Sequence, residues 1–127
     1  MIYFAKGSEK ESLQTEDIQQ GLFSAFDKLG SRKKVMAIPP DYTRFHSRAG
    51  LITQLTQKYF GERLNDILPA LGTHAPMTKE QINKMYADLP HDLFRVHDWR
   101  NDIVTLGEVP GDFVNEVSEG KLDYPWP

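Results

Sequence analysis

Residues 35–44 read Val-Met-Ala-Ile-Pro-Pro-Asp-Tyr-Thr-Arg, and this stretch decides the expected fold. Val35 to Ile38 form a short apolar run that is typical of a buried strand. Pro39 and Pro40 end the predicted strand, because proline has no backbone N–H to donate to a sheet. A polar loop then leads toward a second element, and a strand followed by a loop and a helix is the repeating unit of α/β proteins.

Helical periodicity lies on both sides of this strand. Upstream, the spacing predicts a helix from Thr15 to Leu29 that ends at Gly30. Downstream, Ser47 is the predicted N-cap of a second helix and Gly61 its predicted end. The apolar faces of the two helices consist of Ile18, Leu22, Phe26 and Leu29 in the first, and of Ile52, Leu55 and Tyr59 in the second.

A strand, a loop and a helix then follow again in the same order. Asp66 to Leu71 is a predicted third strand, and Thr78 opens a third helix in which Gln81 completes a capping box. The apolar face of this helix consists of Ile82, Met85, Tyr86 and Leu89.

Four further segments are strand-like, and they complete the predicted order. They are Ile2 to Ala5, Leu93 to Val96, Ile103 to Leu106 and Phe113 to Val117, with a turn at Pro110-Gly111-Asp112 joining the last two. Strands that alternate with helices predict a mostly parallel, Rossmann-like sheet flanked by helices, with extra β segments near the C-terminus. We expect residues 1–127 to form a single α/β domain.

Composition excludes several classes of protein. The 127 residues carry a net charge of −3, which argues against a nucleic-acid platform, and we interpret the basic cluster Arg32 to Lys34 as a solvated edge. There is no cysteine, so disulfides and thiolate metal sites are excluded from this chain. No apolar run approaches the ~20 residues of a membrane span, and Met1 to Gly7 is too short for a signal peptide. We therefore expect a cytoplasmic protein with neither a membrane nor a nucleic-acid partner.

Two polar loops follow the second and third predicted strands, where parallel sheets bind their ligands. They are residues 39–44 and residues 72–78. If the two strands are neighbours, Asp41, Arg44 and His74 converge on one cleft.

The residue types in these loops have complementary chemistry. The guanidinium of Arg44 can hold a carboxylate through two parallel hydrogen bonds, and His74 can accept or donate a proton near neutral pH. Asp41 can orient Arg44 or hydrogen-bond a ligand hydroxyl. The hydroxyls of Thr43 and Thr73 can play the same parts as weaker donors. The alternative is that Asp41 and Thr43 only satisfy a turn, that Arg44 makes a surface ion pair, and that His74 caps or packs.

At these residues the sequence resembles the lactate racemase family, whose members use a nickel-pincer nucleotide. Ile38-Pro39-Pro40-Asp41-Tyr42-Thr43-Arg44 is similar to the family's Asp-x-Thr-Arg loop, and Leu71-Gly72-Thr73-His74-Ala75-Pro76-Met77-Thr78 to its Gly-Thr-His-x-Pro-Met segment. Val96-His97-Asp98 resembles a later Asn-His-Asp-like strand end. The resemblance covers most of the chain, and its second motif is the most specific.

The resemblance implies a role for each of these residues. Asp41 and Arg44 would contact cofactor and substrate, with Thr43 and Thr73 beside the cofactor and Arg44 near the substrate carboxylate. His74 would be one of two catalytic histidines. The substrate would be a small 2-hydroxyacid, whose α-hydride the cofactor takes and returns while a histidine takes the hydroxyl proton.

The remaining histidines do not supply the family's second one. His91 follows Pro90, but its surroundings do not match the family's Glu-Pro-His segment. His46 lies beside Arg44 within reach of a ligand, and His97 is expected to end a strand and hold the fold. The segments that would attach the cofactor and bind nickel are also unmatched, so this chain is expected to hold no metal and no cofactor by itself.

Three functions remain open from the sequence. The first is the N-terminal half-site of a 2-hydroxyacid racemase or epimerase, inactive without a C-terminal domain that is absent from this chain. The second is a non-catalytic module of the same fold that binds a carboxylate or phosphate through Arg44 and the helix N-termini. The third is a structural or interaction domain that uses open sheet edges. The sequence leaves open whether the chain is a piece of a longer protein or a naturally short relative.

Overall fold

The structure is a computed structural model that describes residues 2–127. The chain forms two compact units, one that runs to His97 and one from Asp98 to Pro127, and each is described here by itself. The prediction of one α/β domain over residues 1–127 stays a prediction, because compactness does not measure independent folding.

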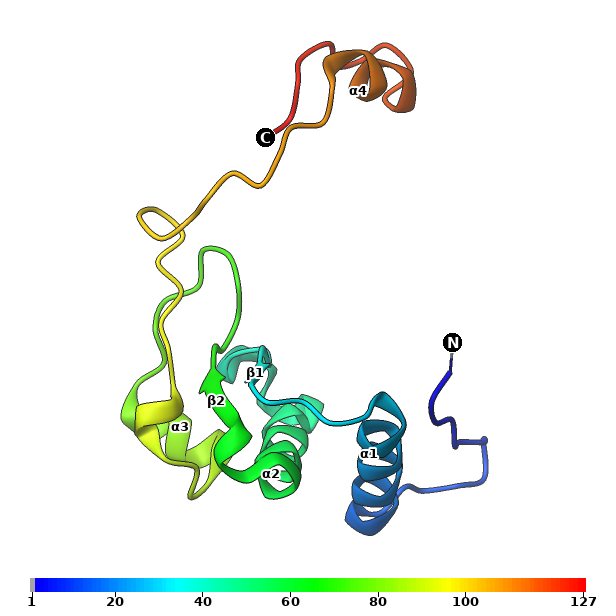
Figure 1. Cartoon of the computed structure of the whole chain (residues 1–127), viewed down its shortest axis with the longest axis vertical. Coiled ribbons are helices and arrows are strands. Elements are labelled where there is room, and N and C mark those ends of the chain that lie inside the picture. The colour runs from blue at the N-terminus through cyan, green and yellow to red at the C-terminus, as the bar shows by residue number, and fades with distance from the viewer. Residues whose placement is uncertain (1) are drawn as a thin grey trace. The chain divides into compact units, whose positions relative to one another are not determined.

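The first unit is built on a small parallel sheet (Figure 1). Strand β1, Val35–Ala37, pairs in parallel with strand β2, Leu64–Ile67. The pairing continues past the strand ends, because the backbone N–H of Ala70 donates to the carbonyl of Pro39 at 2.8 Å. The aligned residues are Val35 with Leu64, Met36 with Asp66 and Ala37 with Ile67.

A third extended segment lies on the other side of β2. Phe94 makes a parallel bridge with Ile67, and the backbone N–H of Arg95 donates to the Ile67 carbonyl at 2.8 Å. The predicted strand from Leu93 to Val96 is thus present only as this bridge. Strand β2 is therefore the middle element of three parallel segments, and the chain leaves all three at the same edge.

Three helices accompany the sheet, as the periodicity predicts. They are α1, Thr15–Leu29, α2, Ala49–Phe60, and α3, Lys79–Tyr86. Short 3₁₀ turns occupy Tyr42–Ser47, Gly61–Arg63 and His91–Leu93. Among residues 2–127, no helix is long and apolar enough to cross a membrane.

The predicted helix ends are confirmed with one exception. Helix α3 begins with a capping box, in which the Thr78 hydroxyl accepts from the Gln81 N–H at 3.2 Å and the Gln81 side chain accepts from the Thr78 N–H at 2.9 Å. Gly61 ends α2 with φ of 56°, a conformation that favours glycine. The prediction of Ser47 as N-cap is wrong by one position, because Arg48 occupies the cap and Ser47 accepts from the Ala49 N–H outside it.

The core joins β2 to the faces of α2 and α3. Leu64 and Ile67 of β2 are almost fully buried, as is Tyr86 of α3. The predicted apolar face of α3 is confirmed for Ile82, Met85 and Tyr86, which are buried, whereas Leu89 is buried beyond the end of the helix. The core cluster consists of Phe60, Leu64, Ile67, Ile82, Met85, Tyr86 and Leu89.

Several predicted strands are corrected by the structure. Ile2 to Ala5 forms no strand, and the Phe4 ring lies over Gly21 of α1, where a Cβ would come within 2.4 Å of it. Ile103 to Leu106 is exposed coil, because no partner strand lies beside it among the described residues. The predicted third strand, Asp66 to Leu71, instead begins at Leu64 and ends at Ile67.

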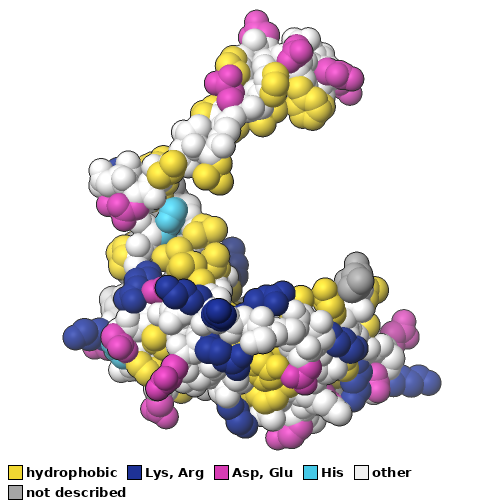
Figure 2. Space-filling view, in the orientation of Figure 1, with side chains coloured by type: hydrophobic (Ala, Val, Ile, Leu, Met, Phe, Trp, Pro, Cys, Tyr) yellow, Lys and Arg dark blue, Asp and Glu magenta, His cyan; other side chains and the backbone are white. Residues whose placement is uncertain are grey.

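The second unit holds one short helix where the sequence predicts a strand. Helix α4, Gly111–Val117, begins after Pro110, and the residues of the predicted turn open it. Proline fits this position because the first helical turn needs few backbone donors. Val109 and Trp126 form an antiparallel bridge, with their backbone groups 2.7 and 3.0 Å apart. Apolar side chains remain on the surface of this unit (Figure 2).

We predict that Gly50→Ala lowers the free energy of unfolding by about 3 kcal/mol. An added Cβ at Gly50 would lie 1.9 Å from the carbonyl oxygen of Met85, so α2 and α3 could not keep their close approach. Alanine normally favours a helix by about 1 kcal/mol, and a loss therefore reports the clash. Urea unfolding measures the change. The control is Gly107→Ala, where a Cβ meets nothing within 4 Å, and equal effects of both substitutions would contradict the packing described.

Candidate functional site

The two predicted loops lie side by side at the carboxyl ends of β1 and β2. The predicted loops are residues 39–44 and residues 72–78, and in the structure the second begins earlier, at residue 68, because β2 ends at Ile67. The hydrogen bond from Ala70 to Pro39 joins them at their starts. The parallel pairing of the strands thus brings together two polar loops that are distant in the sequence.

The Asp41 carboxylate is the centre of this site. Its Oδ1 accepts from the Thr43 N–H at 3.0 Å and from the Thr43 hydroxyl at 2.5 Å. Its Oδ2 lies 2.6 Å from Nδ1 of His74. Asp41 is only 6% exposed, so these bonds replace almost all of its contact with water. Both oxygens are thereby engaged within the protein, and Asp41 orients His74 rather than Arg44.

These contacts keep Asp41 ionised. The Thr43 hydroxyl holds the pKa of Asp41 below its ordinary value, burial opposes this, and the Thr43 N–H and His74 add to the lowering. An ionised carboxylate only accepts hydrogen bonds, so Nδ1 of His74 must carry the proton that it shares with Asp41. In the neutral imidazole the other nitrogen, Nε2, then has a free lone pair. The side chain of His74 is 47% exposed, which leaves Nε2 open to a ligand.

A buried tyrosine holds the first loop in place. The Tyr86 hydroxyl donates to the Pro40 carbonyl at 2.8 Å, directly before Asp41. Burial raises the pKa of Tyr86, so the hydroxyl stays protonated and remains a donor. The helical spacing predicts Tyr86 on the apolar face of its helix but does not predict this role. The signal was the hydroxyl itself, since a buried tyrosine normally finds a hydrogen-bond partner.

Arg44 lies on the same recess but is not bound to Asp41. Its guanidinium makes only long contacts, at 3.4 Å, with the carbonyl and hydroxyl oxygens of Thr43. Within residues 2–127, no carboxylate lies at ion-pair distance from Arg44. Asp41, Thr43, Arg44 and His74 together line an open recess of about 350 Å³. The structure therefore brings the predicted cleft residues together and leaves Arg44 available to an anion.

The other candidates lie outside this recess. Thr73 is exposed on the second loop and does not line it. His46 is exposed with its ring against Phe45, and His91 Nε2 lies 2.6 Å from the side-chain oxygen of Asn83. His97 lines a neighbouring cavity, which His74 also borders. The predicted contact of Thr73 with a cofactor stays a prediction.

The donor set in the recess fits an anion better than a metal ion. Asp41 and His74 are engaged with each other, and the described part of the chain holds no group of three or more His, Asp or Glu side chains placed to ligate a metal. The unpaired guanidinium of Arg44 can hold a carboxylate or a phosphate through two parallel hydrogen bonds.

The chain is similar to part of a protein of known structure. No family model matches the sequence, and no curated protein matches it. A crystal structure of a protein from Thermotoga maritima, solved as a target of the Northeast Structural Genomics Consortium, is 30% identical with a TM-score of 0.71. The match covers 89% of this chain and 29% of the Thermotoga protein. The chain thus shares its fold with a part of a much longer protein.

We predict that Thr43→Val raises the pKa of Asp41 toward its ordinary value. The substitution removes the hydroxyl donor that lowers this pKa most and leaves the backbone donor in place. The pKa can be measured by NMR titration of the carboxyl carbon. Thr73→Val is the matched control and should leave it unchanged. An unchanged pKa in Thr43→Val would contradict the hydrogen bond described.

We also predict that Asp41 stabilises the fold only where it is ionised. Its folded pKa is lowered, so the stabilisation is complete above the unfolded pKa of about 3.9 and is lost as the pH falls through the folded value. Asp41→Asn should lower the free energy of unfolding by roughly 1–3 kcal/mol near neutral pH, and the difference should shrink below about pH 4. Urea unfolding over pH measures it. Exposed Asp88→Asn is the control, and a difference that grows in acid would refute the prediction.

Proposed function

We propose that this chain is the N-terminal half-site of a 2-hydroxyacid racemase or epimerase of the lactate type. The observation that carries the proposal is the Asp41–His74 pair on the recess that Arg44 also lines. An oriented imidazole beside an unpaired guanidinium suits a molecule with a carboxylate and a hydroxyl on adjacent carbons. The sequence motifs that carry the lactate racemase resemblance supply these same three side chains.

Each side chain has a distinct part in the proposed reaction. Arg44 binds the substrate carboxylate and so positions the α-carbon and its hydroxyl. His74 accepts the hydroxyl proton at Nε2 and returns it when the opposite stereoisomer forms. Asp41 keeps the proton on Nδ1 and stabilises the imidazolium while His74 holds both protons. Removal and return of the α-hydride is the chemistry that a nickel-pincer nucleotide would supply if it were bound in the complete protein.

The chain alone is not expected to complete the reaction. Inversion at carbon needs chemical groups on both faces of the substrate, and the recess offers one oriented imidazole. The chain spans 29% of the Thermotoga protein that shares its fold, and the opposite face would come from a C-terminal domain. We therefore assign the carboxylate and one proton transfer to this chain.

The proposal includes a Rossmann-like arrangement of the first unit. In that arrangement, parallel strands are joined by right-handed helical crossovers, and ligands bind beyond the carboxyl ends of the strands. The parallel pairing of β1 with β2 through α2 and the position of the recess support this interpretation.

A non-catalytic anion-binding module is the alternative function. The observation that favours it is the unpaired guanidinium of Arg44. On the face shown in Figure 2, Lys and Arg side chains also gather in a band across the upper part of the first unit. Such a surface attracts carboxylates and phosphates whether or not a reaction follows.

We predict that this chain binds lactate and that Arg44→Ala lowers the affinity by about tenfold or more, because the guanidinium supplies charge-assisted hydrogen bonds. Calorimetry measures the binding, and Arg32→Ala is the matched control outside the recess.

The second prediction concerns catalysis. In the full product of the coding region, assayed with mature cofactor, His74→Ala should lower kcat roughly 10²–10⁴-fold. Full activity of an Arg44→Ala, His74→Ala double variant would rule the racemase out. Binding through Arg44 without activity would favour the anion-binding module.

A further inference from the structure

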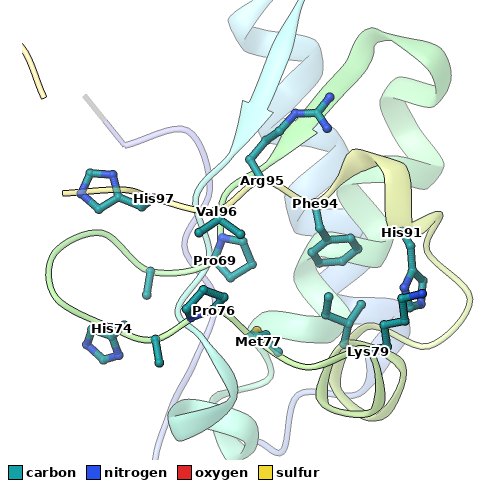
Figure 3. A pocket seen from close by; sticks show the side chains of 13 residues that line it. Pro69, His74, Pro76, Met77, Lys79, His91, Phe94, Arg95, Val96 and His97 are labelled. Carbon is teal, nitrogen blue, oxygen red and sulfur yellow. The ribbon is translucent and has the colours of Figure 1, made fainter. Parts of the chain in front are cut away.

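A second, more enclosed cavity lies beside the recess. It is formed between the second loop and the segment that follows Phe94, with a volume of about 190 Å³. Figure 3 shows Pro69, Pro76, Met77, Phe94 and Val96 around its centre. Its middle is therefore apolar.

His74 belongs to both cavities. His74 lines the recess with Arg44 and Asp41, and it also lines the apolar cavity, as does Ala70. Figure 3 shows His74 at one end of the apolar cavity, on the loop that forms its wall. A molecule whose hydroxyl contacts Nε2 of His74 therefore has an anion-binding group on one side and an apolar space on the other.

We propose that this cavity receives the side chain of the substrate, and that the substrate is a 2-hydroxyacid with a branched aliphatic or aromatic side chain. This proposal rests on the proposed function, because it takes Arg44 to hold the carboxylate and His74 the hydroxyl. It goes beyond that function by naming which 2-hydroxyacids the site prefers.

The size of the cavity supports a bulky group. An apolar protein cavity of roughly 150 Å³ accommodates benzene, and a single water molecule occupies roughly 30 Å³. A space of about 190 Å³ is thus suited to a phenyl or isobutyl group. The methyl group of lactate would leave most of it unfilled and would gain little from the apolar walls.

The charges around the cavity disfavour a second carboxylate. Arg95 is the strongest cation on the lining, but its Nε lies 2.6 Å from Asp66, and Figure 3 shows its guanidinium pointing away from the cavity. His91 is engaged by Asn83 at 2.6 Å. Lys79, at the N-terminus of α3, and His97 are the remaining side chains on the lining that can carry a positive charge. Figure 3 shows them at opposite ends of the cavity, so no cluster of cations replaces the water that a buried carboxylate would lose.

The test is an NMR titration of this chain with four acids that share the 2-hydroxycarboxylate group. They are lactate, 2-hydroxyisocaproate, 3-phenyllactate and malate. Each buried methylene is worth roughly fourfold in affinity, so we expect 2-hydroxyisocaproate and 3-phenyllactate to bind about tenfold or more tightly than lactate and malate. Arg44→Ala should weaken all four.

A pair of variants separates the cavity from the recess. Val96→Trp fills the apolar cavity and should reduce the affinity ratio of 3-phenyllactate to lactate to about one. Val104→Trp, at an exposed valine outside the cavity, should leave the ratio unchanged. Equal binding of lactate and 3-phenyllactate to the unaltered chain, both dependent on Arg44, would overturn the cavity proposal and leave the proposed function standing. Tighter binding of malate would overturn it as well. Binding of none of the acids would overturn both.

Discussion

The contact between Asp41 and His74 is the interaction on which the candidate site depends. Burying a carboxylate costs free energy unless hydrogen-bond donors replace the water that it loses. Thr43 and His74 provide those donors to Asp41. The same contact assigns the proton of the imidazole to Nδ1 and leaves the lone pair of Nε2 free. One interaction thus satisfies a buried charge, ties together the ends of two parallel strands and fixes the orientation of the His74 ring.

Much of the architecture could be predicted because helices carry their signals locally. The bounds of α1 and the capping box at Thr78 follow from residues within a few positions of one another. Strands are different, because an apolar run becomes a strand only where a partner lies beside it. Ile103 to Leu106 has the composition of a strand but no partner among the described residues, and Phe113 to Val117 is helical after Pro110.

The sequence predicts which residues line the site but not which hydrogen bonds they make. Asp41, Arg44 and His74 follow from the rule that parallel strands present their ligands at one edge, and the structure places all three on one recess. From the sequence, Asp41 is a possible partner for Arg44, whereas the structure pairs it with His74. The difference is geometric. Two residues of one short loop need not face each other, whereas the pairing of β1 with β2 places the second loop across from the first.

The hydrogen bond between Tyr86 and Pro40 gives helix α3 a part in the behaviour of the site. It connects positions 46 residues apart, so the first loop keeps its shape only while this eight-residue helix is docked. Local opening of α3 would release the loop, and an occupied recess would in turn favour the docked helix. Ligand binding in the recess and docking of α3 are therefore coupled equilibria. Each stabilises the other by the same coupling free energy. Slower hydrogen exchange of the backbone amides in α3 therefore reports that a ligand occupies the recess.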